Sequence, residues 1–223
     1  MALPALILAS SSPRRRQLLA LLGWPFDILT VEIDERPIAG ERPDDYVQRL
    51  AETKAHTAGP RVPLGSLVLA ADTTVANGKV ILGKPQDATE AAVMLRQLRG
   101  RNHQVYTALA IYEPQTGQLE KDLCVSQVPM RSYSDAEMEA YIASGDPLDK
   151  AGAYAIQHLQ FQPVVNFSGC FASVMGLPLC HLVRTRSKFG NEIRFNDVPR
   201  ACQAELHYDC PISAAVLRGE NLG

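Results

Sequence analysis

The sequence has little net charge and no long apolar run, and both absences exclude classes of protein. Its 22 lysines and arginines nearly balance its 24 aspartates and glutamates, for a net charge of −2. No general positive field is therefore available for non-specific nucleic-acid binding. No apolar run approaches the roughly 20 residues that a membrane-spanning helix needs, and residues 1–10 lack the charged stretch of a secretory signal. We expect a cytoplasmic protein with neither a nucleic acid nor a membrane as partner.

The sequence also lacks a disulfide framework and the common nucleotide and metal motifs. Its five cysteines are scattered, with no Cys-x-x-Cys pair, which is typical of reduced thiols. Residues 78–84 spell the first seven positions of a P-loop, but Pro85 stands where that loop needs a hydroxyl for Mg²⁺. The five histidines show no metal-ligand spacing. A phosphate site in this chain must therefore use another arrangement.

What the sequence does have is an alternation of apolar strands and helices. The apolar run 5–9 predicts a buried strand, and Ser12-Pro13 predicts the start of the helix that follows it. Further strands are predicted at 26–31, 67–71, 103–112 and 119–130, a hairpin around Asn77-Gly78, and helices at 43–58, 88–98, 134–143 and from 176 onward. The pattern predicts an α/β domain, a three-layer mixed sheet with helices on both faces. We expect this domain in residues 1–189, and a C-terminal extension of unknown role in 190–223.

A cluster of hydroxyl and basic side chains follows the first predicted strand. The run from Ser10 to Arg16 contains three serines and three arginines at a predicted helix start. Because a helix N-terminus carries partial positive charge, three guanidiniums there are unfavourable unless an anion binds beside them. Free backbone N–H groups, hydroxyls and guanidinium forks together suit a phosphate chain. The alternative is a solvated basic turn.

Two carboxylates are candidate ligands for a divalent metal. Glu35 follows the second predicted strand, and Asp72 closes the predicted strand 67–71. If these strands are parallel to the first, their ends lie at the same sheet edge as Ser10, where ligands bind in α/β proteins. Carboxylate oxygens at that edge suit a hard cation. A turn or capping role for either residue is the alternative.

Two lysines have no evident structural role. Lys54 interrupts the apolar stripe of the helix predicted for 43–58, so it either extends to solvent at the core margin or meets a charged partner. Lys84 precedes Pro85 in a predicted loop, where a lysine is usually solvated. Both would neutralise a phosphate chain if the loop and the helix met the serine-arginine cluster.

Taken together, these motifs resemble the Maf family of nucleoside triphosphate pyrophosphatases over about residues 5–188. The resemblance rests on the order of the motifs, which are Leu8-Ala9-Ser10-Ser11-Ser12-Pro13-Arg14-Arg15, Asp34-Glu35, Lys54-Ala55, Ala71-Asp72-Thr73, Gly83-Lys84-Pro85 and Gly176-Leu177-Pro178. It implies a Maf/ITPase-like fold with two lobes around a cleft, usually in a homodimer. It also implies hydrolysis of a nucleoside triphosphate to its monophosphate and pyrophosphate, with a divalent cation, Mg²⁺ or Mn²⁺, as cofactor.

The same resemblance implies a role for individual residues. It assigns catalysis to Asp72, Lys54 and Lys84, and phosphate binding to Ser10, Arg14 and Arg15. It assigns metal binding to Glu35 and Asp72. It assigns substrate specificity to Arg14, Thr73 and Gln157. Asp72 resembles the family's proton acceptor. The specificity residues look like those of the dTTP/UTP class, and the amide of Gln157 can donate and accept toward a pyrimidine edge. His158 stands where the family has a glycine and Cys170 where it has a serine, which puts the breadth of substrates in question.

We therefore expect hydrolysis of dTTP and UTP, with modified pyrimidine triphosphates as further candidates, by metal-assisted attack of water at the α-phosphate. A non-catalytic nucleotide-binding regulator of cell division is the alternative, and a phosphatase of small phosphomonoesters is a third. The regulator would bind nucleotide without turnover, and the phosphatase would release free phosphate. The presence of Glu35, Asp72 and Lys84 favours the pyrophosphatase.

Overall fold

One mixed β-sheet organises the molecule. The computed structural model describes residues 4–190 and 197–223, so the first three residues and residues 191–196 of the expected extension lie outside the described residues. The strands are β1 (Leu6–Leu8), β2 (Phe26–Ile28), β3 (Leu67–Asn77), β4 (Val80–Leu82), β5 (Asn102–Glu113) and β6 (Gln118–Pro129). Their order is β2-β1-β3-β5-β6, with β4 paired to the far part of β3. Strand β1 is parallel to β2 and β3, and the other pairs are antiparallel, which confirms the mixed sheet.

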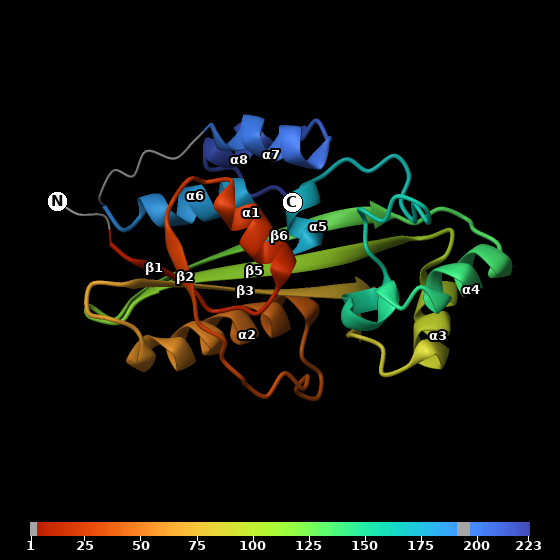
Figure 1. Ribbon diagram of the computed structural model, residues 1–223, viewed down its shortest axis with the longest axis horizontal. Coiled ribbons are helices and arrows are strands. Elements are labelled where there is room, and N and C mark those ends of the chain that lie inside the picture. Colours follow the sequence, from red (N-terminus) through yellow and green to blue (C-terminus); the bar gives the residue numbers. More distant parts are fainter. Residues whose placement is uncertain (1–3, 191–196) are drawn as a thin grey trace.

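Helices cover both faces of this sheet, as predicted (Figure 1). They are α1 (Pro13–Ala20), α2 (Pro43–Ala58), α3 (Ala88–Leu98), α4 (Asp135–Ala143), α5 (Phe171–Met175), α6 (Leu179–Ser187), α7 (Val198–Leu206) and α8 (Ser213–Leu217), with short 3-10 turns η1 (Gly59–Arg61), η2 (Asp146–Asp149) and η3 (Ala151–Ala153). Helix α2 covers one face, α1, α5 and α6 cover the other, and α7 and α8 lie outside α6 (Figure 1). Of the helices in the described ranges, none is long and apolar enough to cross a membrane.

Helix starts follow the capping signals in the sequence. The Ser12 hydroxyl accepts a hydrogen bond from the Arg15 N–H at the start of α1, and Asp87 caps α3 in the same way. Ser134 and Glu137 form a reciprocal capping box at α4. Such caps satisfy N–H groups that have no partner inside the helix. The local sequence therefore sets where these helices begin.

The apolar side chains form cores in two lobes. Around β1 and the near half of β3, Leu8 and Leu69 pack with α1 and α6 on one face, and Leu50 of α2 packs in a cluster with Val68 and Ala70 on the other. At the far end of the sheet, α3 and α4 enclose a separate cluster that includes Leu95 and Phe161. This arrangement confirms the two-lobed fold.

Strand β3 is longer than the sequence predicts. The polar run after Ala71 was expected to end the strand at Asp72, yet β3 continues to Asn77 because β5 pairs with it residue by residue up to Ala76. Strand β1 ends opposite Leu69, and β4 pairs with β3 only from Val75 onward. Asp72 therefore lies inside a strand, at a stretch of its edge where β1 has already ended. The predicted strand 26–31 is also shorter, because its pairing with β1 ends at Ile28.

Candidate active site

A cavity of about 490 Å³ opens between the two lobes and collects most of the candidate residues. Its wall includes Ser10, Arg14, Arg15, Glu35, Lys54, Thr73, Lys84 and Gln157. These residues come from the end of β1 and the start of α1, the loop after β2, helix α2, strand β3, the loop after β4 and the segment after η3. Asp72 does not line the cavity itself and instead lies directly behind Lys54.

Lys54 joins the two candidate carboxylates. Its Nζ lies 2.5 Å from Asp72 Oδ1 and 2.6 Å from Glu35 Oε1. The Lys54 and Asp72 side chains are only 11% and 10% exposed, whereas that of Glu35 is 53% exposed. Of the two sequence-based interpretations of Lys54, the charged partner is therefore the one that the structure shows. Together the three groups carry a net charge of about −1 beside the cavity when all are ionised.

The charge of Glu35 depends on its basic neighbours. Partial burial would raise the pKa of Glu35, but the hydrogen bond from Lys54 and the charges of Lys54, Lys84 and Arg15 outweigh it and hold the pKa below its ordinary value. Its backbone oxygen accepts a hydrogen bond of 2.8 Å from the Tyr46 hydroxyl on α2. The loop after β2 is thus fixed to the helix that carries Lys54. Glu35 remains a carboxylate at neutral pH.

Arg15 is held by backbone and hydroxyl oxygens rather than by a carboxylate. Its Nε donates to Gly176 O at 2.9 Å, and its two terminal nitrogens donate to Ser10 Oγ at 3.4 Å and Thr73 Oγ1 at 3.3 Å. Burial lowers the pKa of Arg15, while the Asp72 charge acts to raise it. A guanidinium stays protonated under such conditions. Arg15 is therefore a fixed cation in the cavity wall.

The hydroxyl of Thr73 is committed to this support. The Thr107 hydroxyl donates its hydrogen to Ser173 O at 2.8 Å, so across the 2.9 Å contact between the two threonines Thr73 must donate to Thr107. Thr73 also accepts from Arg15. A hydroxyl has one hydrogen to donate, and both partners here belong to the protein. This geometry links Thr73 to the position of Arg15.

The cavity wall also contains residues that sequence reasoning did not single out. Lys150 is buried, and its Nζ donates to Asp146 O at 2.7 Å, to Asp146 Oδ1 at 3.0 Å and to Asp149 Oδ1 at 2.6 Å. All three ammonium hydrogens are used, so Lys150 fixes the wall rather than offering a free charge. Asp149-Lys150 precedes Gln157 by only a few residues, and a lysine between helix-breaking Pro147 and Gly152 was the available signal.

Gly152 connects this wall to the loop that carries Lys84. Its N–H donates to Gly83 O at 3.0 Å. Its φ is +68°, and a Cβ at this position would lie 2.9 Å from both methyl groups of Val75. Only glycine satisfies both the backbone conformation and the close approach. The segment that presents Gln157 and the loop that presents Lys84 therefore have a fixed relative position.

Tyr154 lines the same wall and is held from behind by a histidine. The Tyr154 hydroxyl lies 2.7 Å from His103 Nε2 on β5, and both side chains are buried. Burial lowers the pKa of His103 to about 4. The histidine is therefore neutral at physiological pH, and the pair is a structural support for the cavity wall.

The donor set fits a divalent cation bound jointly with a substrate. No group of three or more His, Cys, Asp or Glu side chains within 4–190 and 197–223 forms a metal cage. Glu35 and Asp72 nevertheless direct one oxygen each to a common position, now taken by the Lys54 ammonium. Mg²⁺ is commonly held by one or two carboxylates together with substrate phosphates. Two hard oxygen ligands beside a basic cavity match that pattern.

Comparisons with known proteins show which family the chain belongs to. A family model described as "Maf-like protein" matches residues 5–189. The chain is 50% identical over 186 residues to a protein of Myxococcus xanthus named dTTP/UTP pyrophosphatase, covering 83% of this chain and 92% of that protein. It is 45% identical over 186 residues to a Methylococcus capsulatus protein of the same name, covering 83% and 91%. A solved dITP/XTP pyrophosphatase of Mycobacterium abscessus is 16% identical, covers 84% of this chain and 98% of its own, and has a TM-score of 0.42.

Proposed function

The chain belongs to the Maf family, and from that premise we propose that it is a nucleoside triphosphate pyrophosphatase acting on dTTP and UTP. Relatives at 50% and 45% identity, which align over most of their own length, carry the name dTTP/UTP pyrophosphatase. The reaction is hydrolysis of the bond between the α- and β-phosphates, with release of the monophosphate and pyrophosphate. Modified pyrimidine triphosphates are further candidate substrates.

The observation that carries this proposal is the charge distribution of one cavity. Arg14, Arg15, Lys54 and Lys84 all line it, although they come from three separate segments of the chain. A triphosphate bears about four negative charges near neutral pH, and four cations with backbone N–H groups at the start of α1 provide matching charge. A carboxylate pair beside these cations supports catalysis rather than binding alone.

In the proposed mechanism, the protein positions the triphosphate and deprotonates water. Ser10, Arg14 and Arg15 bind the β- and γ-phosphates, and Lys84 and Lys54 neutralise charge near the α-phosphate. The Asp72 carboxylate accepts a proton as the water oxygen forms a bond to the α-phosphorus. The bond from that phosphorus to the bridging oxygen breaks, and pyrophosphate leaves with the electron pair. Fixed cations stabilise the negative charge that spreads over these oxygens in the transition state.

A divalent cation, Mg²⁺ or Mn²⁺, is the proposed cofactor, and Glu35 and Asp72 would hold it. Such an ion supplies positive charge to the phosphate oxygens and lowers the pKa of a bound water. Lys54 contacts both carboxylates, and its ammonium would neutralise phosphate charge if the ion took its place between them. Glu35, whose side chain is half exposed and lines the cavity, would be the more accessible of the two ligands.

Selection of the base is proposed to depend on Gln157, with Arg14 and Thr73. Gln157 lines the same cavity as Arg14 and Arg15. Its amide can both donate to and accept from a pyrimidine edge. Because Thr73 bonds Arg15 and Thr107, we propose that Thr73 acts on selectivity through the position of Arg15.

The cellular setting is part of the proposal. We propose a cytoplasmic location, because all five cysteines are free thiols in the structure and reduced thiols are typical of that compartment. We also propose that the protein is a homodimer, as the family resemblance implies. Light scattering coupled to size-exclusion chromatography measures the mass directly, and a value near 24.4 kDa would show a monomer instead.

The test is a panel of nucleoside triphosphates assayed with Mg²⁺ or Mn²⁺ for pyrophosphate and phosphate separately. We expect dTTP and UTP to give pyrophosphate as the first product. Asp72→Asn should lower kcat by about 10²–10⁴-fold, the usual contribution of a general base, with the fold retained. Asp135→Asn, at an exposed ion pair with Arg99, is the matched control and should retain activity. Affinity without turnover would support the regulator, and free phosphate as first product would support the phosphatase.

A further inference from the structure

Helix α5 supplies the backbone oxygens that hold Arg15 in the cavity wall. Gly176, which ends this helix, accepts from Arg15 Nε at 2.9 Å. Ser173 O accepts from Thr107, which in turn accepts from the Thr73 hydroxyl that Arg15 contacts. Arg15 thus depends on α5 at two points, one direct and one through two hydroxyl groups. A displacement of α5 would displace the guanidinium.

Helix α5 has little stability of its own. It spans only Phe171–Met175, and Cys170 at its N-cap makes no side-chain cap hydrogen bond to the described chain. One turn of helix is far below the length at which a helix is stable in isolation, so its position must come from packing. It contacts β5 and β6 of the sheet, and outside the sheet it contacts α1 and α7.

The outer support is the C-terminal segment 197–223. The Tyr208 hydroxyl, just after α7, accepts a hydrogen bond from Gly169 N at 3.1 Å and donates one to Phe167 O at 3.3 Å. Its ring packs against Phe167 and Phe171, with centroid distances of 5.6 and 5.4 Å. Tyr208 therefore bonds the backbone of the turn that leads into α5 and contacts the first residue of the helix.

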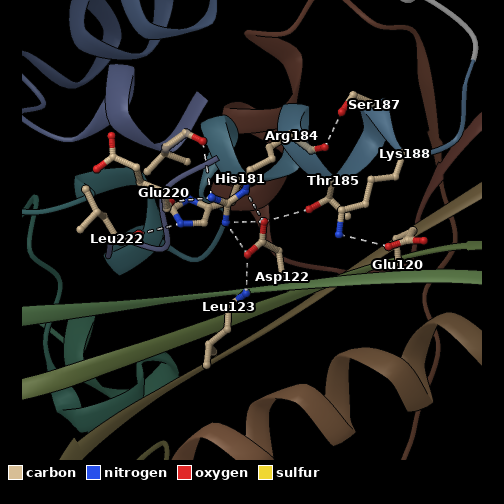
Figure 2. A network of polar contacts seen from close by, with 11 residues as sticks. Glu120, Asp122, Leu123, His181, Arg184, Thr185, Ser187, Lys188, Glu220 and Leu222 are labelled. Atoms are coloured by element: carbon tan, nitrogen blue, oxygen red, sulfur yellow. Dashed lines mark hydrogen bonds and ion pairs between the residues drawn. The ribbon is translucent and has the colours of Figure 1, made fainter. Parts of the chain in front are cut away.

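The segment is itself anchored at its far end, as Figure 2 shows. Asp122 on β6 forms an ion pair of 2.7 Å with Arg184 on α6, and both side chains are less than 15% exposed. Arg184 also donates to Glu220 O at 2.6 Å, and the His181 ring lies 2.8 Å from Leu222 O. The chain after α8 is therefore tied to α6 by side chains that are fixed in turn to the sheet.

Packing between the segment and the domain is close. The space left between α5, α6 and α7 is about 20 Å³, enough for one water molecule and too small for a ligand. Cys202 and Leu206 of α7 and Ile212 pack against the apolar core that contains Cys170 and Ala172. The contact is therefore continuous with the core, so a shift of the C-terminal segment would shift α5.

We propose that the C-terminal segment is a brace that positions Arg15 through α5, with Tyr208 as the positioning residue. The Maf family model ends at residue 189, so the brace lies outside the part of the chain that this model matches. It follows that the phosphate-binding geometry of this protein depends on residues beyond the family domain. The kinetic readout of this inference rests on the proposed function, whereas its effect on α5 does not.

The first test compares two tyrosine variants by hydrogen–deuterium exchange. Tyr208→Phe removes the hydroxyl that bonds Phe167 and Gly169, and Tyr133→Phe, the matched control, removes a buried hydroxyl that bonds Leu95 O in the other lobe. We expect exchange in residues 171–177 to rise about 3- to 10-fold in Tyr208→Phe, the range set by the loss of one hydrogen bond, and to stay unchanged in Tyr133→Phe. Equal protection of α5 in both variants overturns the proposal.

The second test asks whether the effect passes through Arg15. In the wild-type background, Tyr208→Phe should lower kcat/KM for UTP by about 3- to 10-fold, and in an Arg15→Lys background it should have no further effect. If the fold-losses of the two single variants multiply in the double variant, the brace acts elsewhere than through Arg15, and the proposal is overturned. If the wild-type protein hydrolyses no nucleoside triphosphate but still binds inorganic pyrophosphate, the proposed function fails, and the same cycle measured as the Kd for inorganic pyrophosphate decides the brace. If it neither binds nor turns over, both fail.

Discussion

Replacement of Lys54 by methionine removes the cation that joins Glu35 and Asp72. The Asp72 side chain is 10% exposed, so the substitution would leave a buried carboxylate without its ion-pair partner. Loss of one partner from a buried ion pair destabilises a protein by about 3–5 kcal/mol. The half-exposed Glu35 adds little, because solvent screens its charge. We therefore expect Lys54→Met to cost about 3–5 kcal/mol of unfolding free energy and to abolish turnover.

A companion substitution separates charge burial from loss of packing. In Lys54→Met/Asp72→Asn the buried carboxylate is replaced by a neutral amide, whose unpaired burial costs only about 1–2 kcal/mol. Stability should therefore recover by about 2–3 kcal/mol relative to Lys54→Met, while activity should not recover. Lys121→Met is the matched control, since Lys121 pairs with Glu52 at 2.6 Å with both side chains more than a third exposed. Its loss should cost about 0–1 kcal/mol.

Urea denaturation without added divalent metal measures all four proteins. With a slope near 2 kcal/mol per molar urea, Lys54→Met should shift the midpoint down by about 1.5–2.5 M. The double variant should regain at least half of that shift. A cost below about 1 kcal/mol for Lys54→Met, or no recovery on adding Asp72→Asn, would refute the account of Asp72 as a buried charge held by Lys54.

Two further predictions concern the wall that presents Gln157. Gly152→Ala should destabilise the fold by about 2–4 kcal/mol, because it combines an unfavourable positive φ with a clash against Val75. Gly78→Ala has a similar φ of +62° but nothing within 4 Å of its Cβ, so a chemical-denaturation cost equal to that of Gly152→Ala would contradict the clash. For His103, burial lowers the pKa to about 4 from 6.5, so the unfolded chain binds a proton in this range that the folded protein does not. The free energy of unfolding should therefore have its full value above pH 6.5 and fall by about 3 kcal/mol as the pH drops toward 4. A His103→Gln variant whose unfolding free energy changes with pH as steeply as that of the wild type would disprove this.

The elements that the sequence predicts well have local signals at their ends. Helix 43–58 coincides with α2, which has Pro43 at its first position and Gly59 after its last, and helix 88–98 coincides with α3, which Asp87 caps. These signals act over a few residues and need no tertiary contact. Helices α5 and α7 were not predicted because they are short and their positions depend on packing against distant segments.

The length of β3, in contrast, is set by pairing with a distant strand and not by a local signal at its end. Asp72-Thr73-Thr74 has the composition of a strand end, but β5 supplies hydrogen-bond partners along the whole stretch, so the strand continues. Pairing between strands that are more than 30 residues apart cannot be read from local polarity. The error mattered little for the site, because Asp72 still lies where β1 stops and the sheet edge opens.

The sequence by itself determined many of the residues that line the candidate site, because residue type and motif order are properties of the chain. Ser10, Arg14, Glu35, Lys84 and Gln157 were all candidates before any coordinates were known, and all line one cavity. Only the tertiary structure decided their roles toward one another. It placed Asp72 behind Lys54, committed Thr73 to Arg15, and set Tyr208 against the turn before α5. Such contacts join segments far apart in the chain, and their geometry depends on strand register and helix packing, which no local pattern encodes.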